Sequence, residues 1–207
     1  MANHESSSIR LLEYKNILKK LKGLGFSKVF SSNLADTLGI SASLVRKDFT
    51  QLTTSGNKKG GYIIDDLLGE INRLLNKGTE TGAVIVGFGK LGKALCNYRG
   101  FIDENIRFVA AFDTDESKID PDADVPVFPA EKLAEFVSTN KIKIAVLTIP
   151  GDVVQRTVDI LVIAGVKGFL NFVPFRLVLP ADCYENHINL AMELEKVILH
   201  ITNGHKG

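Results

Sequence analysis

The order of apolar and polar residues divides the chain into a helical first part and an alternating second part. Apolar residues from Ile9 to Leu21 recur at helical spacing and predict a first helix, which two glycines end. Two short helices are then expected over residues 31–38 and 42–52, with Ser41 as the N-cap of the second. A turn of three or four residues that contains glycine joins them, which predicts a helix-turn-helix.

The next segments are polar, then helical, then polar again. Residues 53–62 are rich in Gly, Thr, Ser, Asn and Lys, which favours a short β-hairpin wing. Residues 65–75 have the spacing of a connecting helix, and residues 76–82 have the composition of a linker. The first part of the chain is therefore predicted to be a winged helix-turn-helix.

Short apolar runs alternate with helical stretches through most of the second part. Strands are expected at 83–87, 106–112, 143–148 and 168–172, and the helices between them near 91–98, 130–139 and 151–164. Such alternation implies a parallel sheet with right-handed crossovers. A last helix, from about His187 to Thr202, has a broad apolar stripe that could pack on its own sheet or on a second subunit.

A glycine motif follows the first of these strands. Gly87, Gly89 and Gly92 form G-x-G-x-x-G between a predicted strand and a helix. In a dinucleotide-binding unit these glycines permit the tight turn, let the backbone approach a pyrophosphate and let the helix pack on the strand. Asp113 ends the next strand, where such folds bind the adenosine ribose. The order of these features favours NAD or NADH, and Asp113 would repel the 2′-phosphate of NADP.

Two other interpretations of this loop stay open. Gly87 to Lys93 also satisfies G-x-x-x-x-G-K, but Ala94 stands where a P-loop needs Ser or Thr for magnesium, so ATP is less favoured. A glycine turn that only packs a strand on a helix is the other alternative.

Charge separates the two parts of the chain more clearly than composition does. Residues 1–62 have ten Lys/Arg and four Asp/Glu, a net charge of +6, whereas the remainder has a net charge of −5. Ser43, Arg46, Lys47 and Thr50 share one face of the second short helix, and Lys58 and Lys59 lie at the predicted wing tip. Since the second helix of a helix-turn-helix enters the major groove, this pattern favours DNA binding over a solvated helix face.

Other classes are less favoured. A small NAD-dependent oxidoreductase with an accessory helical module is the alternative function, but only some thirty-five residues follow the predicted sheet to form a substrate pocket. Cys96 and Cys183 are interpreted as ordinary thiols, and no His or Cys spacing indicates a metal site. No signal peptide or membrane span is predicted, which favours the cytoplasm.

Taken together, these motifs resemble the bacterial redox-sensing repressor family called Rex along nearly the whole chain. The similarity includes Ser31-Ser32, Leu44-Val-Arg-Lys-Asp48 and Gly61-Tyr62, then Val86 to Gly92, Asn97-Tyr98, Gly100-Phe101, Phe112-Asp113, Thr148-Ile-Pro150 and Ala164 to Pro174.

The resemblance implies a homodimer that binds an inverted-repeat operator and blocks transcription when NADH is scarce. It also implies that NADH binding rotates the nucleotide domains, and that the C-terminal helix swaps onto the partner near the nicotinamide. The expected fold is α/β, with a winged helix at 1–77, a Rossmann-like NADH/NAD⁺ domain at 78–185 and a dimerisation helix at 186–207.

The expected site residues follow from the motif and the resemblance. Ser43, Arg46, Lys47, Lys58 and Lys59 are expected to bind DNA. The residues expected to contact the dinucleotide are Gly87, Phe88, Gly89, Lys90, Leu91 and Gly92 at the pyrophosphate, Asp113 at the ribose, and Tyr98, Thr148 and Pro150 around the nicotinamide. A regulator that responds to ATP or to a coenzyme A thioester is a third possibility.

This chain departs from the family pattern at three places. Gln51-Leu52-Thr53 replaces a Tyr-Phe-Gly run after the recognition helix. Asn16 and Asn189 stand where well-studied members have an Arg and an Asp that form a redox-dependent salt bridge. That Asp also binds the tyrosine matching Tyr98 when NAD⁺ is bound. We therefore expect this protein to separate NADH from NAD⁺ differently from those members.

Overall fold

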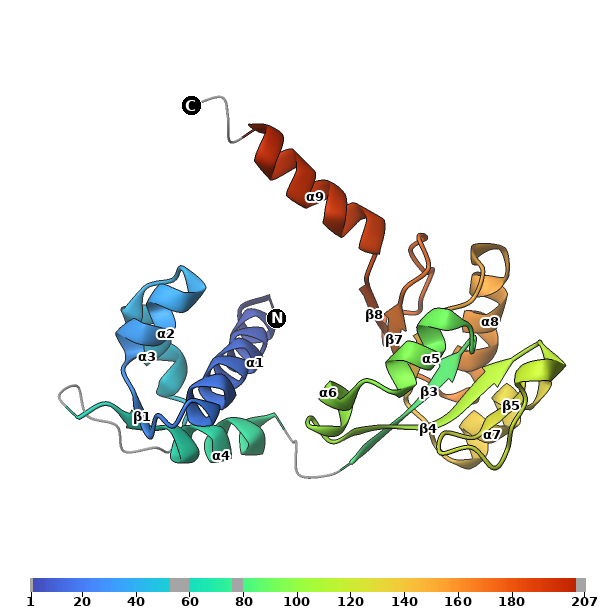
Figure 1. Ribbon diagram of the computed structural model, residues 1–207, viewed down its shortest axis with the longest axis horizontal. Coiled ribbons are helices and arrows are strands. Elements are labelled where there is room, and N and C mark those ends of the chain that lie inside the picture. Colours follow the sequence, from blue (N-terminus) through green and yellow to red (C-terminus); the bar gives the residue numbers. More distant parts are fainter. Residues whose placement is uncertain (1, 53–59, 76–79, 204–207) are drawn as a thin grey trace. The chain divides into compact units, whose positions relative to one another are not determined.

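The computed structural model describes residues 2–52, 60–75 and 80–203, and the chain forms two compact units, Met1–Thr79 and Glu80–Gly207 (Figure 1). The first unit is mainly helical, and the second contains a six-stranded sheet.

The elements of the first unit form a helix-turn-helix between two longer helices. They are α1 (Ala2–Gly23), β1 (Lys28–Val29), α2 (Ser31–Leu38), α3 (Ala42–Phe49), β2 (Tyr62–Ile63) and α4 (Ile64–Leu74). Gly39 ends α2 in the left-handed conformation at φ +65°, and the Ser41 hydroxyl accepts a hydrogen bond from the Leu44 N–H at 3.2 Å at the start of α3. The helix-turn-helix and the Ser41 cap are thus confirmed, and α1 begins well before the predicted Ile9.

The helix α3 buries one face and exposes the other. Val45 and Phe49 are buried in the core of this unit, and Leu52, one turn beyond the helix, is buried with them. The Phe49 ring meets Tyr14 and Tyr62 edge-on, at centroid distances of 5.3 and 5.1 Å. This packing fixes α3 against α1 and β2.

The predicted hairpin wing over residues 53–62 stays a prediction, because the described residues include only its end, where β2 begins at Tyr62. β2 pairs antiparallel with β1, a two-residue strand that the sequence did not predict. Most of the expected hairpin, including Lys58 and Lys59, lies outside the described residues.

All four predicted strands of the second unit are confirmed. They are β3 (Thr81–Val86), β4 (Ile106–Asp113), β6 (Ile144–Leu147) and β7 (Gly168–Asn171), and two further strands, β5 (Val127–Pro129) and β8 (Tyr184–His187), complete the sheet. All pairs are parallel in the order β5-β4-β3-β6-β7-β8. Counted along the unit, this is the 3-2-1-4-5-6 order of the Rossmann fold.

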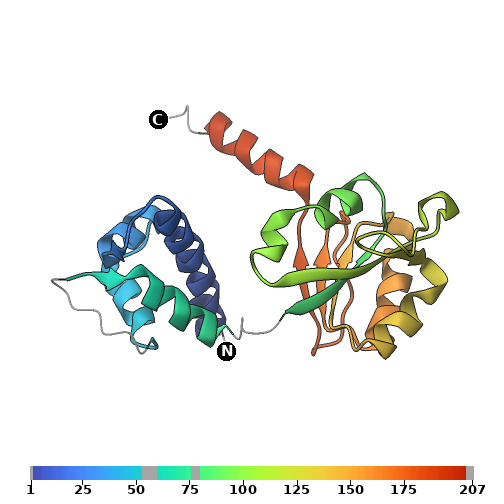
Figure 2. The same cartoon turned by 60° about the horizontal axis from the view of Figure 1, so that its bottom comes forward.

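Helices cover both faces of this sheet. On one face, α7 (Leu133–Thr139) and α8 (Gly151–Ala164) pack over Val86, Phe112 and Leu147. On the other, α5 (Lys90–Cys96) and α6 (Arg99–Ile102) pack over Ile85 (Figure 2). Short 3₁₀ turns lie at Glu116–Lys118 and Ala130–Lys132. The result is a three-layer α/β unit.

Three predicted boundaries are wrong. The helix α3 ends at Phe49 and does not extend to residue 52. Thr81 and Gly82 pair with β4 and belong to β3, not to a linker. The last helix, α9, spans Leu190–Asn203 and does not begin at His187, because His187 pairs with Asn171 in β8.

Candidate dinucleotide site and nucleic-acid interface

The turn between β3 and α5 requires glycine at two of its three motif positions. Gly87 has φ +95°, and a Cβ there would lie 2.6 Å from the Thr148 carbonyl oxygen. A Cβ on Gly92 would overlap the Gly87 carbonyl oxygen. Gly89 has φ −78° and nothing within 4 Å of its Cβ position. The fold therefore does not itself need glycine at 89, and the backbone there is open to approach.

Three strand ends meet at this turn. The Gly87 N–H donates to the Phe112 carbonyl at 2.8 Å, and the Thr148 hydroxyl donates to the Gly87 carbonyl at 2.7 Å. The Phe88 N–H donates to Asp113 Oδ2 at 2.7 Å. Because β3 lies between β4 and β6, where the strand order reverses, this network lies at the sheet's topological switch point, where Rossmann folds bind their ligands.

Asp113 is the most constrained side chain of this network. Its carboxylate is 9% exposed and accepts hydrogen bonds from the N–H groups of Phe88 and Asp115 and from the Lys118 ammonium. Burial opposes ionisation, but these hydrogen bonds and the Lys118 charge hold the pKa of Asp113 below its usual value. Sequence reasoning found Asp113 but missed Lys118.

The other expected dinucleotide residues lie on the segments that follow β3 and β6. Lys90 and Leu91 form the first turn of α5, whose N-cap is Gly89. Tyr98 caps α6, is 61% exposed and meets Phe101 edge-on at 5.4 Å. Pro150 precedes α8 and is exposed. The hydrogen bonds of the described residues thus join Gly87, Phe88, Asp113 and Thr148, and leave Tyr98 and Pro150 outside the network.

The exposed face of α3 has the polarity of a recognition helix. Ser43, Arg46 and Lys47 are all exposed. The Arg46 guanidinium donates to the Ser31 hydroxyl at 3.1 Å, which links α3 to the start of α2. Ser31 is the first residue of α2, and Phe30 is the N-cap of that helix.

A buried polar cluster on the opposite face of α3 was not anticipated. Asp48 accepts two hydrogen bonds from the Arg10 guanidinium, both 2.7 Å long, and one from the Tyr14 hydroxyl at 2.8 Å. Burial raises the pKa of Tyr14, and the hydrogen bonds from Arg10 and Tyr14 outweigh burial and lower the pKa of Asp48. This cluster ties α1 to the recognition helix.

Gln51 and Leu52, which stand where the family pattern has an aromatic pair, make contacts within the first unit. Leu52 is 6% exposed in the core, and the Gln51 side-chain amide donates to the Ser7 hydroxyl at 3.0 Å. These contacts join α1 to the end of α3 at the place where the family pattern has an aromatic pair.

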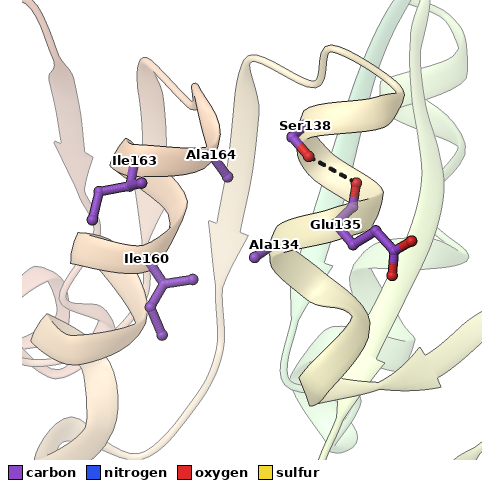
Figure 3. Close-up of a pocket in the computed structure, with 6 residues that line it drawn as sticks. All are labelled: Ala134, Glu135, Ser138, Ile160, Ile163 and Ala164. Atoms are coloured by element: carbon purple, nitrogen blue, oxygen red, sulfur yellow. Dashed lines mark hydrogen bonds between the residues drawn. The ribbon is translucent and has the colours of Figure 1, made fainter.

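Other parts of the described chain contain fewer groups that could bind a ligand or react. A shallow hollow of about 380 Å³ lies between α7 and α8, lined by Ala134, Glu135, Ser138, Ile160, Ile163 and Ala164 (Figure 3). Both cysteines are half-buried, and burial raises the pKa of the Cys96 thiol to about 11. Within the described ranges, no cluster of His, Cys, Asp and Glu could hold a metal ion, and no helix is long and apolar enough to cross a membrane.

The two units together define a class of protein. A winged helix-turn-helix with an exposed basic recognition helix is joined to a Rossmann-type unit with a glycine turn and an acidic strand end. This is the architecture of a DNA-binding regulator that responds to a nucleotide.

The comparisons with known proteins narrow this class. A family model described as "CoA binding domain" matches residues 79–175, and one described as "Putative DNA-binding protein N-terminus" matches residues 5–50. A relative from Listeria welshimeri named "Redox-sensing transcriptional repressor Rex" is 34% identical over 96% of this chain and 93% of its own. Another of that name, from Lactobacillus acidophilus, is 36% identical over 94% and 92%.

Solved structures agree with these relatives. The Rex-family repressor RSP, crystallised with β-NAD⁺ and operator DNA, is 28% identical and has a TM-score of 0.86 over 97% of this chain and 93% of its own. The structure of RSP with β-NADH has a TM-score of 0.84 over 97% and 95%. The chain belongs to the Rex family of redox-sensing transcriptional repressors.

Proposed function

We propose that this protein is a repressor that binds operator DNA as a homodimer and releases it when NADH binds. The observation that carries the proposal is the network of Gly87, Phe88, Asp113 and Thr148 at the topological switch point, in a chain of the Rex family. A relative of the same architecture was solved in one structure with β-NADH and in another with β-NAD⁺ and operator DNA.

The glycine turn fits a dinucleotide. Gly89 leaves space where a side chain would stand, and the N–H groups of Lys90 and Leu91 begin a helix. We assign the pyrophosphate to residues 87–92 and the adenosine ribose to Asp113. We assign the nicotinamide to the region of Tyr98, Thr148 and Pro150. When bound, the nicotinamide supplies the difference in ring charge between NAD⁺ and NADH.

The recognition helix fits the major groove. We assign DNA contacts to Ser43, Arg46 and Lys47, and further contacts to Lys58 and Lys59 in the predicted wing. A dimer would present two such helices to the two halves of an inverted repeat.

The apolar stripe of the C-terminal helix α9 is evidence for the proposed dimer. Leu190, Leu194, Val197 and Ile201 follow a heptad spacing, and their side chains are between 54% and 63% exposed. An exposed apolar stripe of this kind marks a protein interface. We therefore keep residues 186–207 as a proposed dimerisation segment, with 1–77 and 78–185 as the proposed DNA-binding and nucleotide-binding domains.

We further propose that the protein acts in the cytoplasm and is not an enzyme. The names of its relatives support this, since they describe transcriptional repressors. The second candidate ligand is a coenzyme A thioester, because the family model over residues 79–175 is described as a CoA binding domain.

The direct test is fluorescence anisotropy of a labelled inverted-repeat operator, titrated separately with NADH, NAD⁺ and acetyl-coenzyme A. Release by NADH at concentrations where NAD⁺ has little effect is the expected result. Equal release of the operator by NADH and NAD⁺ would contradict redox sensing. Release by acetyl-coenzyme A alone would favour the second candidate ligand. Catalytic consumption of NADH by the purified protein would favour an oxidoreductase.

A matched pair of variants tests the DNA interface. Lys47→Ala is expected to weaken operator binding and to reduce its salt dependence by about one phosphate contact. Lys132→Ala removes the same charge from an exposed position in the second unit and is expected to leave binding unchanged. Equal effects of the two variants would argue against α3 as the recognition helix.

A further inference from the structure

Lys118 occupies the acceptor positions of Asp113 that a ribose would use. Asp113 Oδ2 accepts from the Phe88 N–H at 2.7 Å, and Oδ1 accepts from the Asp115 N–H at 2.9 Å. Lys118 Nζ lies 3.2 Å from Oδ1 and 3.1 Å from Oδ2. A carboxylate has about four lone-pair positions, so these contacts fill it. Ribose hydroxyls can donate to Asp113 only after one of these partners leaves.

Lys118 is the partner that can leave. The N–H groups of Phe88 and Asp115 are held by the backbone on either side of the carboxylate. The Lys118 side chain is 28% exposed and reaches Asp113 on a flexible four-carbon stem. It is brought there by the 3₁₀ turn Glu116–Lys118, which the Asp115 side chain caps by accepting from the Ser117 N–H at 3.1 Å.

The same ammonium changes how this edge of the sheet receives a phosphate. Asp113 alone would repel the 2′-phosphate that distinguishes NADPH from NADH. Lys118 places a positive charge beside that carboxylate, so it reduces the repulsion and offers the phosphate a partner.

We propose that Lys118 sets the nucleotide specificity of this protein: it covers Asp113, competes with the ribose hydroxyls and weakens the rejection of a 2′-phosphate. This inference rests on the proposed dinucleotide function. Lys118 acts on the ribose hydroxyls through Asp113 and on a 2′-phosphate directly, and no chemical step is assigned to it.

Calorimetric titration of the full-length protein with NADH and with NADPH tests the proposal. Lys118→Met is expected to lower the Kd for NADH and to raise the Kd for NADPH, each by about threefold, so that the preference for NADH rises about tenfold. Lys118→Arg retains the charge and is expected to keep the wild-type preference within about twofold. Lys118→Gln, which is polar and neutral, repeats the test if the methionine variant does not fold.

Lys167→Met is the matched control. Lys167 also pairs with an aspartate, Asp182, at 2.5 Å, but it directly precedes β7 at the amino end of the parallel sheet, whereas Asp113 lies at the carboxyl end. Wild-type affinity for both nucleotides is expected. An unchanged NADH/NADPH preference in Lys118→Met, a weaker NADH affinity, or an equal shift in Lys167→Met would overturn the proposal. A wild-type protein that binds neither nucleotide would instead overturn the proposed function on which it rests.

Discussion

The two units each hold one nearly buried aspartate, and the partners of these two carboxylates differ. The Asp48 side chain is 4% exposed and is held by Arg10 and the fully buried Tyr14. The Asp113 side chain is 9% exposed and is held by two backbone N–H groups and Lys118. Both have a pKa below the usual value of aspartate, with hydrogen bonds overcoming burial.

The difference lies in which partner can be exchanged. Arg10 binds Asp48 through two parallel hydrogen bonds, a geometry that holds the planar guanidinium in place. Lys118 bridges Asp113 as a point charge at the edge of the sheet. We infer that the first aspartate keeps a helix in position, whereas the second is available to a ligand.

The largest expected effect comes from breaking the buried polar cluster of Arg10, Tyr14 and Asp48. Arg10→Ala leaves Asp48 buried without its cation, which is expected to cost the first unit about 3–5 kcal/mol of unfolding free energy. Lys22→Ala removes a cation from an ion pair with Asp65 that is 59% and 67% exposed, and is expected to cost less than about 1 kcal/mol. Chemical denaturation measures the unfolding free energy of both variants. Similar losses in the two would contradict a stabilising role of the buried polar cluster.

The glycine turn provides a sharper contrast within the second unit. Gly92→Ala forces a Cβ against the Gly87 carbonyl and is expected to cost about 1–3 kcal/mol as well as NADH affinity. Gly89→Ala meets no atom within 4 Å and is expected to keep the melting temperature while NADH affinity falls about tenfold or more. Thermal melts and NADH titrations separate the two. Full NADH affinity in Gly89→Ala would contradict the assignment of the pyrophosphate to this turn.

Acid is expected to weaken the stabilisation that the buried polar cluster gives to the first unit. Because the folded-state pKa of Asp48 is lowered, its contribution to stability is complete above the unfolded value of about 3.9 and is lost as the pH falls through the folded value. The unfolding free energy of the first unit should therefore fall below about pH 4, by less than Arg10→Ala costs. Denaturation at a series of pH values measures this, and an identical acid loss in Arg10→Ala would exclude Asp48 as its source.

The smallest expected effect concerns the choice between NADH and NAD⁺. Asn189 Oδ1 accepts from the Met192 N–H at 3.1 Å at the start of α9. An aspartate caps a helix about as well, so Asn189→Asp adds charge without loss of the cap. By the family pattern, NAD⁺ is expected to gain affinity relative to NADH, about twofold or more. Asn186→Asp, at an exposed position of β8, is the control, and an unchanged ratio of the two affinities would exclude the idea.

The sequence predicted the fold wherever a pattern was local. The four central strands are apolar runs, and Gly39 ends α2 where the sequence predicted a glycine stop. β8 has polar and half-exposed residues at the edge of the sheet, and β5 is three residues long, so neither has the pattern of a buried strand. His187 was assigned to a helix for the same reason.

The site was predictable as far as its motif extends along the chain. Gly87 and Asp113 lie at the expected strand ends, and Gly92 lies in the first turn of α5, because the Rossmann order fixes these positions. Lys118 reaches Asp113 only through the intervening 3₁₀ turn. Arg10 and Asp48 are 38 positions apart. The first contact depends on the conformation of a loop, and the second on how α1 packs against α3, and neither is part of the patterns that predicted the fold.

The measurement that tests the account most directly is a reciprocal titration. Operator affinity is measured with and without saturating NADH, and NADH affinity with and without saturating operator. If nucleotide and DNA binding are coupled in one two-state protein, NADH weakens operator binding and operator weakens NADH binding by the same factor, at least about fivefold. A factor of one in both directions would show that the nucleotide and the operator bind independently, and would contradict the account.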